Sequence, residues 1–193
     1  MEEGTVTVDG VTRKVPEPFV VIATENPIGS AGTQMLPESQ LDRFLICIQM
    51  GYPSPEDEID ILMSQSERKT LEEIQPVVDA SILAQMQRET AQVFIHETVC
   101  RYIVDLVNAT RSHELVTLGL STRGALAVAK LAKANAYIEG RAFVLPKDVE
   151  KVFPAAAVHR LKCSTKVTMN KGASMDIIEE ILKSVKQPRP EKK

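Results

Sequence analysis

The stretch VTVDGVTRKVPEPFVVIATENP, residues 6–27, decides how the first part of this chain folds. It opens with two short β-prone runs separated by Asp9-Gly10, a dipeptide that favours a tight hairpin. After two prolines, the continuous apolar run 19–23 predicts a buried strand. The polar residue Asn26 stands just beyond that run. We therefore expect a hairpin over 5–15 and a buried strand with an amide side chain at its tip.

The next residues extend this α/β pattern for a short distance. A short helix is predicted over 38–43, and the apolar run 45–48 predicts a second buried strand. Ser54-Pro55 followed by acidic residues is typical of a helix start. The polar stretch 64–76, which ends at a proline, is a candidate linker. A first domain is thus expected over 1–66.

Beyond the linker, the apolar spacing is that of helices throughout. Helix starts are predicted after Asp79 and at Pro146, and Gly140 predicts the end of a helix over 122–138. The apolar stripes consist of Ile82, Leu83 and Met86; Val99, Cys100, Ile103, Leu106 and Val107; Ala127, Leu131, Ala134 and Ile138; Val149, Val152 and Phe153; and Ile177, Ile178, Ile181, Leu182 and Val185. We expect a bundle of four to five helices over 77–186, followed by a flexible tail over 187–193.

Composition narrows the function classes. A net charge of −3 argues against a dominant electrostatic attraction to nucleic acid or to an anionic membrane. No apolar stretch approaches the roughly 20 residues that span a bilayer. The 3 cysteines are widely spaced and odd in number, which favours a reducing, cytoplasmic compartment over a disulfide framework. The histidines and cysteines lack the spacing of metal ligands, so we expect no metal site on these residues.

Three polar residues are candidates for contacts with a nucleotide phosphate. An amide such as Asn26 can donate and accept at a fixed geometry, and the guanidinium groups of Arg43 and Arg123 suit the charge on a γ-phosphate. The usual phosphate cradle, G-x-x-x-x-G-K-[ST], does not occur in the sequence. The nearest string, 119–124, is followed by Ala125 where the lysine would stand.

Each candidate also has a purely structural interpretation. Asn26 precedes a proline and could simply form a turn. Arg43 could pair with its neighbour Asp42 at a helix end. Arg123 could belong, with Lys130 and Lys133, to a solvated basic helix face. For the two lysines the solvated face is the preferred interpretation.

Two longer strings together resemble the MoxR family of AAA+ ATPases. They are TVTVDGVTRKVPEPFVVIATENPIGSAGTQMLPESQLDRFLICIQMGYPS over residues 5–54 and LSTRGALAVAKLAKANAYIEGRAFVLPKDVEKVFPAAAVHRL over 120–161. The resemblance implies a partial AAA+ α/β core, with hairpin and two strands, followed by an all-α lid. It implies that Asn26 is sensor 1, that Arg43 in the segment 41–44 is the arginine finger, and that Arg123 is sensor 2. Asp42 would then hold or orient the finger.

The same resemblance implies a biochemical setting. Such proteins use ATP and Mg²⁺, form rings that are commonly hexamers, and act as chaperones on partners that often carry a von Willebrand A domain. The family's Walker A and Walker B motifs precede the residues that match Met1, so we expect this chain to be the C-terminal portion of a larger ATPase, inactive and without tightly bound nucleotide by itself. Thr122 stands where many relatives have proline.

An alternative from another class is a stand-alone helical module that binds protein or DNA through 122–138. Its arginine and lysines would suit a recognition helix. The negative net charge and the scarcity of asparagine and glutamine on that helix argue against DNA.

Overall fold

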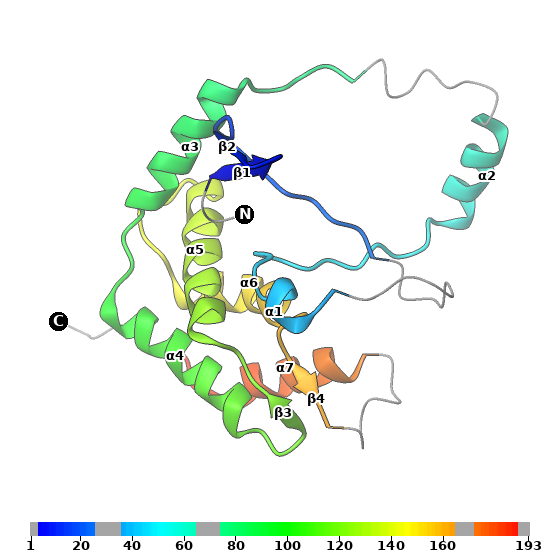
Figure 1. Ribbon diagram of the computed structural model, residues 1–193. Helices are drawn as coiled ribbons and strands as arrows, with labels where there is room; N and C mark the ends of the chain where they lie inside the picture. Colours follow the sequence, from blue (N-terminus) through cyan, green and yellow to red (C-terminus); the bar gives the residue numbers. More distant parts are fainter. Residues whose placement is uncertain (1–3, 26–35, 65–73, 165–171, 189–193) are drawn as a thin grey trace.

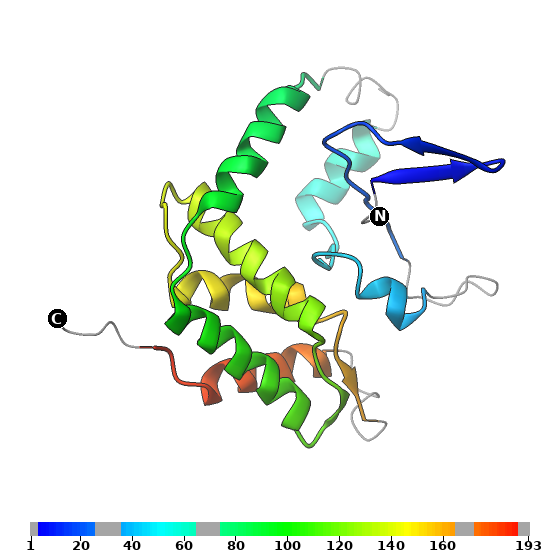
Figure 2. The same cartoon turned by 60° about the vertical axis from the view of Figure 1, so that its left-hand side comes forward.

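The computed structural model describes residues 4–25, 36–64, 74–164 and 172–188 (Figure 1). Within them the chain forms a long helical unit and a less compact N-terminal region that lies to one side of it (Figures 1 and 2). The elements in chain order are β1 Thr5–Val8, β2 Val11–Lys14, α1 Glu38–Leu41, α2 Pro55–Ser64, α3 Ala80–Gln92, α4 Glu97–Ser112, β3 Val116–Leu118, α5 Thr122–Ile138, α6 Pro146–Ala157, β4 Lys162–Cys163 and α7 Ala173–Ser184. None of these helices is both long and apolar enough to cross a lipid bilayer.

The predicted hairpin is confirmed. β1 and β2 pair antiparallel with Val8 opposite Val11, so that only Asp9 and Gly10 form the turn. Both turn residues have positive φ, 52° and 77°, as a two-residue turn of the primed type requires. Every residue of the two strands is exposed, and the hairpin projects away from the helices in Figure 2.

The two predicted buried strands are not found. Residues 19–23 and 45–48 belong to no sheet, and apart from the partly buried Cys47 their side chains are exposed. Ile22 is 87% exposed and Ile48 is 67% exposed. A buried strand needs neighbouring strands and a covering layer. In the described part of the chain the only sheets are the pairs β1-β2 and β3-β4, so neither stretch acquires a ladder.

The helix predicted after Ser54 is confirmed as α2. The Ser54 Oγ accepts a hydrogen bond from the Asp57 N–H at 3.1 Å and donates one to the Asp57 carboxylate at 2.8 Å. This reciprocal cap satisfies a backbone donor at the helix start. The apolar side chains of α2, among them Ile59 and Leu62, are exposed rather than packed. Most of the candidate linker 64–76 lies outside the described residues.

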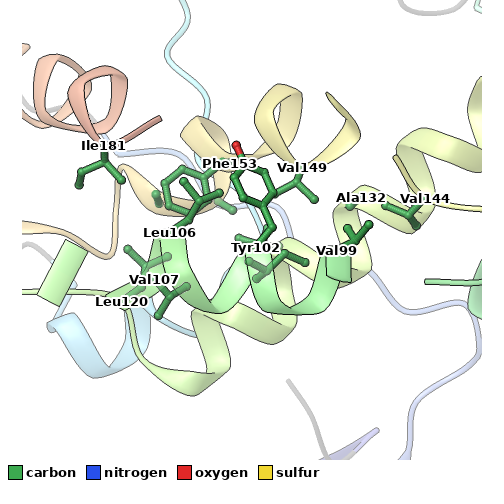
Figure 3. Packing of buried hydrophobic residues seen from close by; sticks show 14 of the residues in the cluster. Val99, Tyr102, Leu106, Val107, Leu120, Ala132, Val144, Val149, Phe153 and Ile181 are labelled. Carbon is green, nitrogen blue, oxygen red and sulfur yellow. The ribbon is translucent and has the colours of Figure 1, made fainter. Parts of the chain in front are cut away.

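The helical unit has a continuous aliphatic core between α4, α5, α6 and α7. Leu106 and Phe153 are fully buried there, and Tyr102 lies between them and Val149 (Figure 3). The stripes predicted for α6 and α7 face this core. On α4 the prediction is correct except at Cys100, which is exposed because it lies one residue off the stripe; Tyr102 takes a place in the core that the periodicity did not assign.

The face of α5 that packs differs from the predicted one. Ala127 is buried as predicted, but Ile138 is 77% exposed. Gly124, Val128, Ala132 and Ala136 form the buried face instead. Since nearly every position from 125 to 136 is apolar, periodicity alone could not select the side that packs. The helix itself starts at Thr122 and ends before Gly140, whose φ of 71° supports the predicted stop.

Candidate functional site

Of the three candidate residues, the structure describes Arg43 and Arg123, whereas Asn26 lies outside the described residues. Arg43 follows α1, and Arg123 is the second residue of α5. The segments that carry them meet at one polar junction, in which Asp42 is the central acceptor. This junction, which joins the residues after α1 to those after α6 and to the N-cap of α5, is the candidate functional site.

Arg43 is held in a tight turn. Its N–H donates to the Gln40 carbonyl at 3.1 Å, and the Phe44 N–H donates to the Leu41 carbonyl at 3.0 Å. The turn directs two neighbouring side chains differently: Arg43 is exposed, whereas the Asp42 side chain is only 25% exposed. Asp42 fastens this turn to the helical unit through Ser121 and Arg160, and such an anchor can orient Arg43 through the turn itself.

The Asp42 carboxylate accepts from two different elements. The Ser121 hydroxyl donates to its oxygens at 3.0 and 3.3 Å, and the Arg160 Nε donates to Oδ1 at 2.9 Å. Ser121 is also the N-cap of α5, because its Oγ accepts from the Gly124 N–H at 3.2 Å. One carboxylate thus joins the turn that bears Arg43 to the start of the helix that bears Arg123.

Arg160 makes the largest set of contacts in the junction. Its guanidinium donates to the main-chain carbonyls of Asp42, Phe44 and Leu45. It also donates to the carbonyl of Ala156 at the end of α6, the helix that precedes Arg160. The side chain is 3% exposed. Burial lowers the pKa of Arg160 and the Asp42 carboxylate works against that shift, so the group stays charged at neutral pH. Gly124 makes room for it, since a Cβ there would stand 3.2 Å from the Arg160 Cδ.

His159 completes the junction. Its Nε2 lies 3.1 Å from the Phe44 carbonyl oxygen, so Nε2 is assigned as the protonated nitrogen of the neutral ring. Nδ1 is buried and has no hydrogen-bond partner among the described residues. Burial, followed by the nearby Arg160 charge, lowers the pKa of His159. The ring is therefore a neutral donor at physiological pH.

The loop before α5 is fixed from the other side by the end of α4. The Arg111 Nε donates to the Leu120 carbonyl at 2.8 Å, and the Leu120 N–H donates to the Thr110 Oγ1 at 3.0 Å. Gly119 is required here, because a Cβ would stand 2.7 Å from the Arg111 main-chain nitrogen. The start of α5, with its N–H groups and Arg123, is thereby presented in one orientation that suits an anion.

The predicted basic face of α5 is only partly a solvated surface. Lys130 is exposed, as expected. Lys133, by contrast, is half-buried and donates to the Ala91 carbonyl at 2.9 Å, and the Tyr137 hydroxyl donates to Glu89. These two contacts fasten α5 to α3. Because α5 also packs against α4 and α6, little of it is left to enter a DNA groove as the alternative module would require.

The junction suits phosphate oxygens better than it suits a metal ion. Arg43 and Arg123 are permanent cations on the two segments that the Asp42 carboxylate joins. Among the described residues no group of three or more histidine, cysteine or acidic side chains could hold a metal. We therefore assign no Mg²⁺ ligand to the described part of the chain.

Sequence reasoning missed Ser121, His159 and Arg160 as members of the site. Arg160 lies 118 residues from Asp42 along the chain, a pairing that no local pattern indicates. The one usable signal is a charged residue, Arg160, shortly after the apolar run 155–158, because an arginine is rarely buried unless it is paired.

Comparisons with known proteins agree with this architecture. Residues 108–181 match the family model for the AAA lid domain, and residues 1–46 match that for the ATPase family associated with various cellular activities (AAA). Over 97% of its length the chain is 40% identical to the uncharacterized protein YeaC of Bacillus subtilis, of which it covers 59%. It is 34% identical to the chaperone MoxR1 of Mycobacterium tuberculosis over 98% of its length and covers 52% of that protein.

A crystal structure of a "putative ATPase" from Cytophaga hutchinsonii has a similar fold. It superimposes with a TM-score of 0.86 at 30% identity, over 97% of this chain and 60% of that one. This chain thus spans between half and three-fifths of the length of these relatives.

Proposed function

Because this chain belongs to the MoxR family of AAA+ ATPases, we propose that it forms the lid-bearing part of an enzyme that hydrolyses ATP to remodel or mature partner proteins. The observation that carries the proposal is the Asp42 junction. It joins an exposed arginine on a tight turn to a helix start that carries a second arginine. Two cations on segments joined by one carboxylate suit a phosphate shared between two subunits.

Each candidate residue then has a distinct role. Arg123 contacts the phosphates of the nucleotide beneath its own lid. Arg43 reaches the γ-phosphate bound by the neighbouring subunit of a ring, where such an arginine is worth roughly 10³–10⁵ in rate. Asn26 orients the attacking water. The ligands of Mg²⁺ and the phosphate cradle are supplied by residues outside the described part of this chain.

The first test compares two proteins by calorimetric titration of Mg-ATP. One is this 193-residue chain, and the other is the product of the complete reading frame from which it comes. We expect binding and turnover only in the latter, because this sequence has no phosphate-binding loop. Tight ATP binding by the short chain, or turnover by it that Arg43→Ala abolishes, would contradict the proposal.

The second test separates the two arginines. In the complete protein we expect Arg43→Ala and Arg123→Ala each to abolish most ATP turnover, whereas Arg101→Ala, a change at an exposed residue of α4, leaves it unchanged. Mixing the two inactive variants should restore part of the activity. A mixed ring contains sites where an intact Arg123 beneath one lid meets an intact Arg43 from the neighbour. Failure of mixing to restore activity, in rings shown to exchange subunits, would refute the role of Arg43 in trans.

The proposal about the partner starts from the likeness to a protein described as a chaperone. We propose that clients carry a von Willebrand A domain. The test is an ATP-dependent change in the protease sensitivity of such a domain in the presence of the complete protein. A change that occurs equally without ATP would contradict a remodelling role.

A further inference from the structure

We propose that Arg160 is a positioning residue that couples the turn bearing Arg43 to the start of α5, so that a movement of α5 is transmitted to Arg43. For its catalytic consequence the inference rests on the function proposed above. Its geometric part concerns this chain alone and can be tested without ATP.

The first step of the argument is that polar contacts, rather than apolar packing, hold the turn. The apolar side chains of the segment 45–50 are largely exposed, with Ile48 at 67% and Met50 at 89%. The described contacts that hold the turn and this segment to the helical unit are hydrogen bonds and ion pairs. Besides those of Asp42 and Arg160, they are the hydrogen bond from His159 to the Phe44 carbonyl, the hydrogen bond from the Cys47 N–H to the Ala155 carbonyl, and the exposed ion pair between Lys162 and Glu38.

The second step is that Arg160 is the member of this set that touches every part of the junction. Its guanidinium binds the side chain and carbonyl of Asp42, two further carbonyls of the segment, and the Ala156 carbonyl at the end of α6. Its alkyl stem lies against Gly124 in the first turn of α5. A planar fork of five donors can hold such a divergent set of acceptors, whereas an ammonium cannot.

The third step is that the contacts form a continuous path from α5 to the turn that carries Arg43. Asp42 receives Arg160 on one side and the α5 N-cap Ser121 on the other. A displacement of α5 therefore moves Ser121 and, through Asp42, the rigid turn that carries Arg43. We infer that a lid movement triggered at Arg123 in one subunit repositions the arginine offered to the next.

The geometric test measures a distance between two spin labels in this chain. Labels are placed at Gln40→Cys on α1 and Lys130→Cys on α5, both exposed, in a background where the three native cysteines are serine. We expect a narrow distance distribution that Arg160→Met broadens. The matched control is Arg101→Met, which removes an exposed arginine paired only with Glu97 in the next turn of its own helix. This control should leave the distribution narrow.

A second variant separates loss of the coupling from loss of the helical fold. Arg160 caps α6, so its loss could loosen the helices, and circular dichroism monitors that. Asp42→Asn lies outside the helical core and removes the ion pair, so we expect it to broaden the distribution with the helical signal unchanged. Distributions as narrow as in the unmodified chain in both Arg160→Met and Asp42→Asn would overturn the proposal.

The catalytic test uses the complete protein. Arg160→Lys keeps the charge but loses the fork, so we expect kcat to fall roughly 10- to 100-fold with the KM for ATP little changed, because misplacing a reacting group acts on the chemical step. Arg101→Lys should leave both constants unchanged. An unchanged kcat in Arg160→Lys would overturn the coupling. If the unmodified complete protein fails to hydrolyse ATP, the proposed function is overturned instead, and the distance measurement alone decides the coupling.

Discussion

The helical unit and the N-terminal region of this chain are stabilised in different ways. Within α4, α5, α6 and α7, residues such as Leu106 and Phe153 are fully removed from solvent. In the described parts of residues 4–63, by contrast, no residue is buried. The two regions lie beside each other, and the hairpin projects away from the helices in Figure 2. The same chain therefore combines a segment with its own core and a segment with none.

The difference shows what positions the candidate site. A region without a core cannot direct Arg43 by packing, since the hydrophobic effect acts on area removed from water. Its orientation comes from directional contacts at one junction, above all those of Asp42 and Arg160. Stability and site geometry should thus respond to different substitutions, and the predictions below test that separation.

The largest effect is expected from a pair of matched truncations. Phe153→Ala opens a cavity in the middle of the helical core, and we expect it to lower the free energy of unfolding by about 3–5 kcal/mol. Phe19→Ala removes the same side chain from a position that is 52% exposed, and a cost of about 0.5 kcal/mol or less is expected. Urea unfolding followed by circular dichroism measures both. Equal costs would show that residue 19 is buried in solution and that the contrast between the regions is false.

A somewhat smaller effect is expected at a polar site within the helical unit. The Asp148 carboxylate is 4% exposed and accepts from Arg141, from the Asn135 amide at 2.6 Å and from the Leu145 N–H at 2.7 Å. Burial acts to raise the pKa of Asp148, but these donors hold it below its ordinary value. Asp148→Ala should cost about 3 kcal/mol, because it leaves buried donors unpaired.

The matched control for this change is Asp105→Ala, on the exposed side of α4. We expect little change in the urea midpoint for that variant. If Asp148→Ala were as mild as the control, the segment between α5 and α6 would be held by its apolar contacts alone. Apolar packing would then stabilise the helical unit without help from this polar cluster, and its contrast with the N-terminal region would be sharper than the Asp148 contacts indicate.

How far the sequence could predict this structure follows the same division. Local signals were sufficient where the cause is local: Asp9-Gly10 specified the hairpin turn, and Ser54 specified the start of α2. The strand predicted over 19–23 failed because its burial depends on partners that the described residues do not supply. In α5 the excess of apolar positions concealed the packing face, so that Ile138 was placed in the core and is exposed.

The candidate site was predictable only in part for a related reason. Arg43 and Arg123 could be proposed from motifs, yet their connection runs through Arg160, which contacts residues about 115 positions earlier in the chain. A contact of that range arises from tertiary folding and has no counterpart in local spacing. The roles of Asn26, Arg43 and Arg123 stay predictions.

The pH dependence of the junction offers a third test. The pKa of His159 is lowered in the folded protein, chiefly by burial. Below about pH 6.5, the ordinary pKa of histidine, the unfolded chain therefore binds a proton at this residue more readily than the folded chain does. The stabilising contribution is thus complete above that pH and is lost as the pH falls through the folded value. We expect the free energy of unfolding to decline from pH 7 towards pH 5, and His159→Gln to remove part of that decline.

The control for His159→Gln is the interval from pH 7 to pH 8, where the histidine is neutral in both the folded and the unfolded state. Over that interval the curves of unfolding free energy against pH should be parallel for the variant and the unmodified chain. Parallel curves at lower pH as well would show that His159 is accessible to solvent. The Phe44 carbonyl would then have lost its fixed donor, and the junction would be looser than the contacts of Arg160 indicate.

The smallest effect on global stability is expected from a substitution in the hairpin turn. Gly10 has a φ of 77°, and a side chain in that left-handed conformation costs about 1–2 kcal/mol. Gly10→Ala should therefore weaken the pairing of β1 with β2, which amide hydrogen exchange at Thr7 and Thr12 would detect. The helical melting curve should not move, because the strands are exposed and add nothing to the core. A melting temperature lowered as much as by a core truncation would mean that the hairpin packs on the helices after all, and that the N-terminal region is stabilised by more than the Asp42 junction.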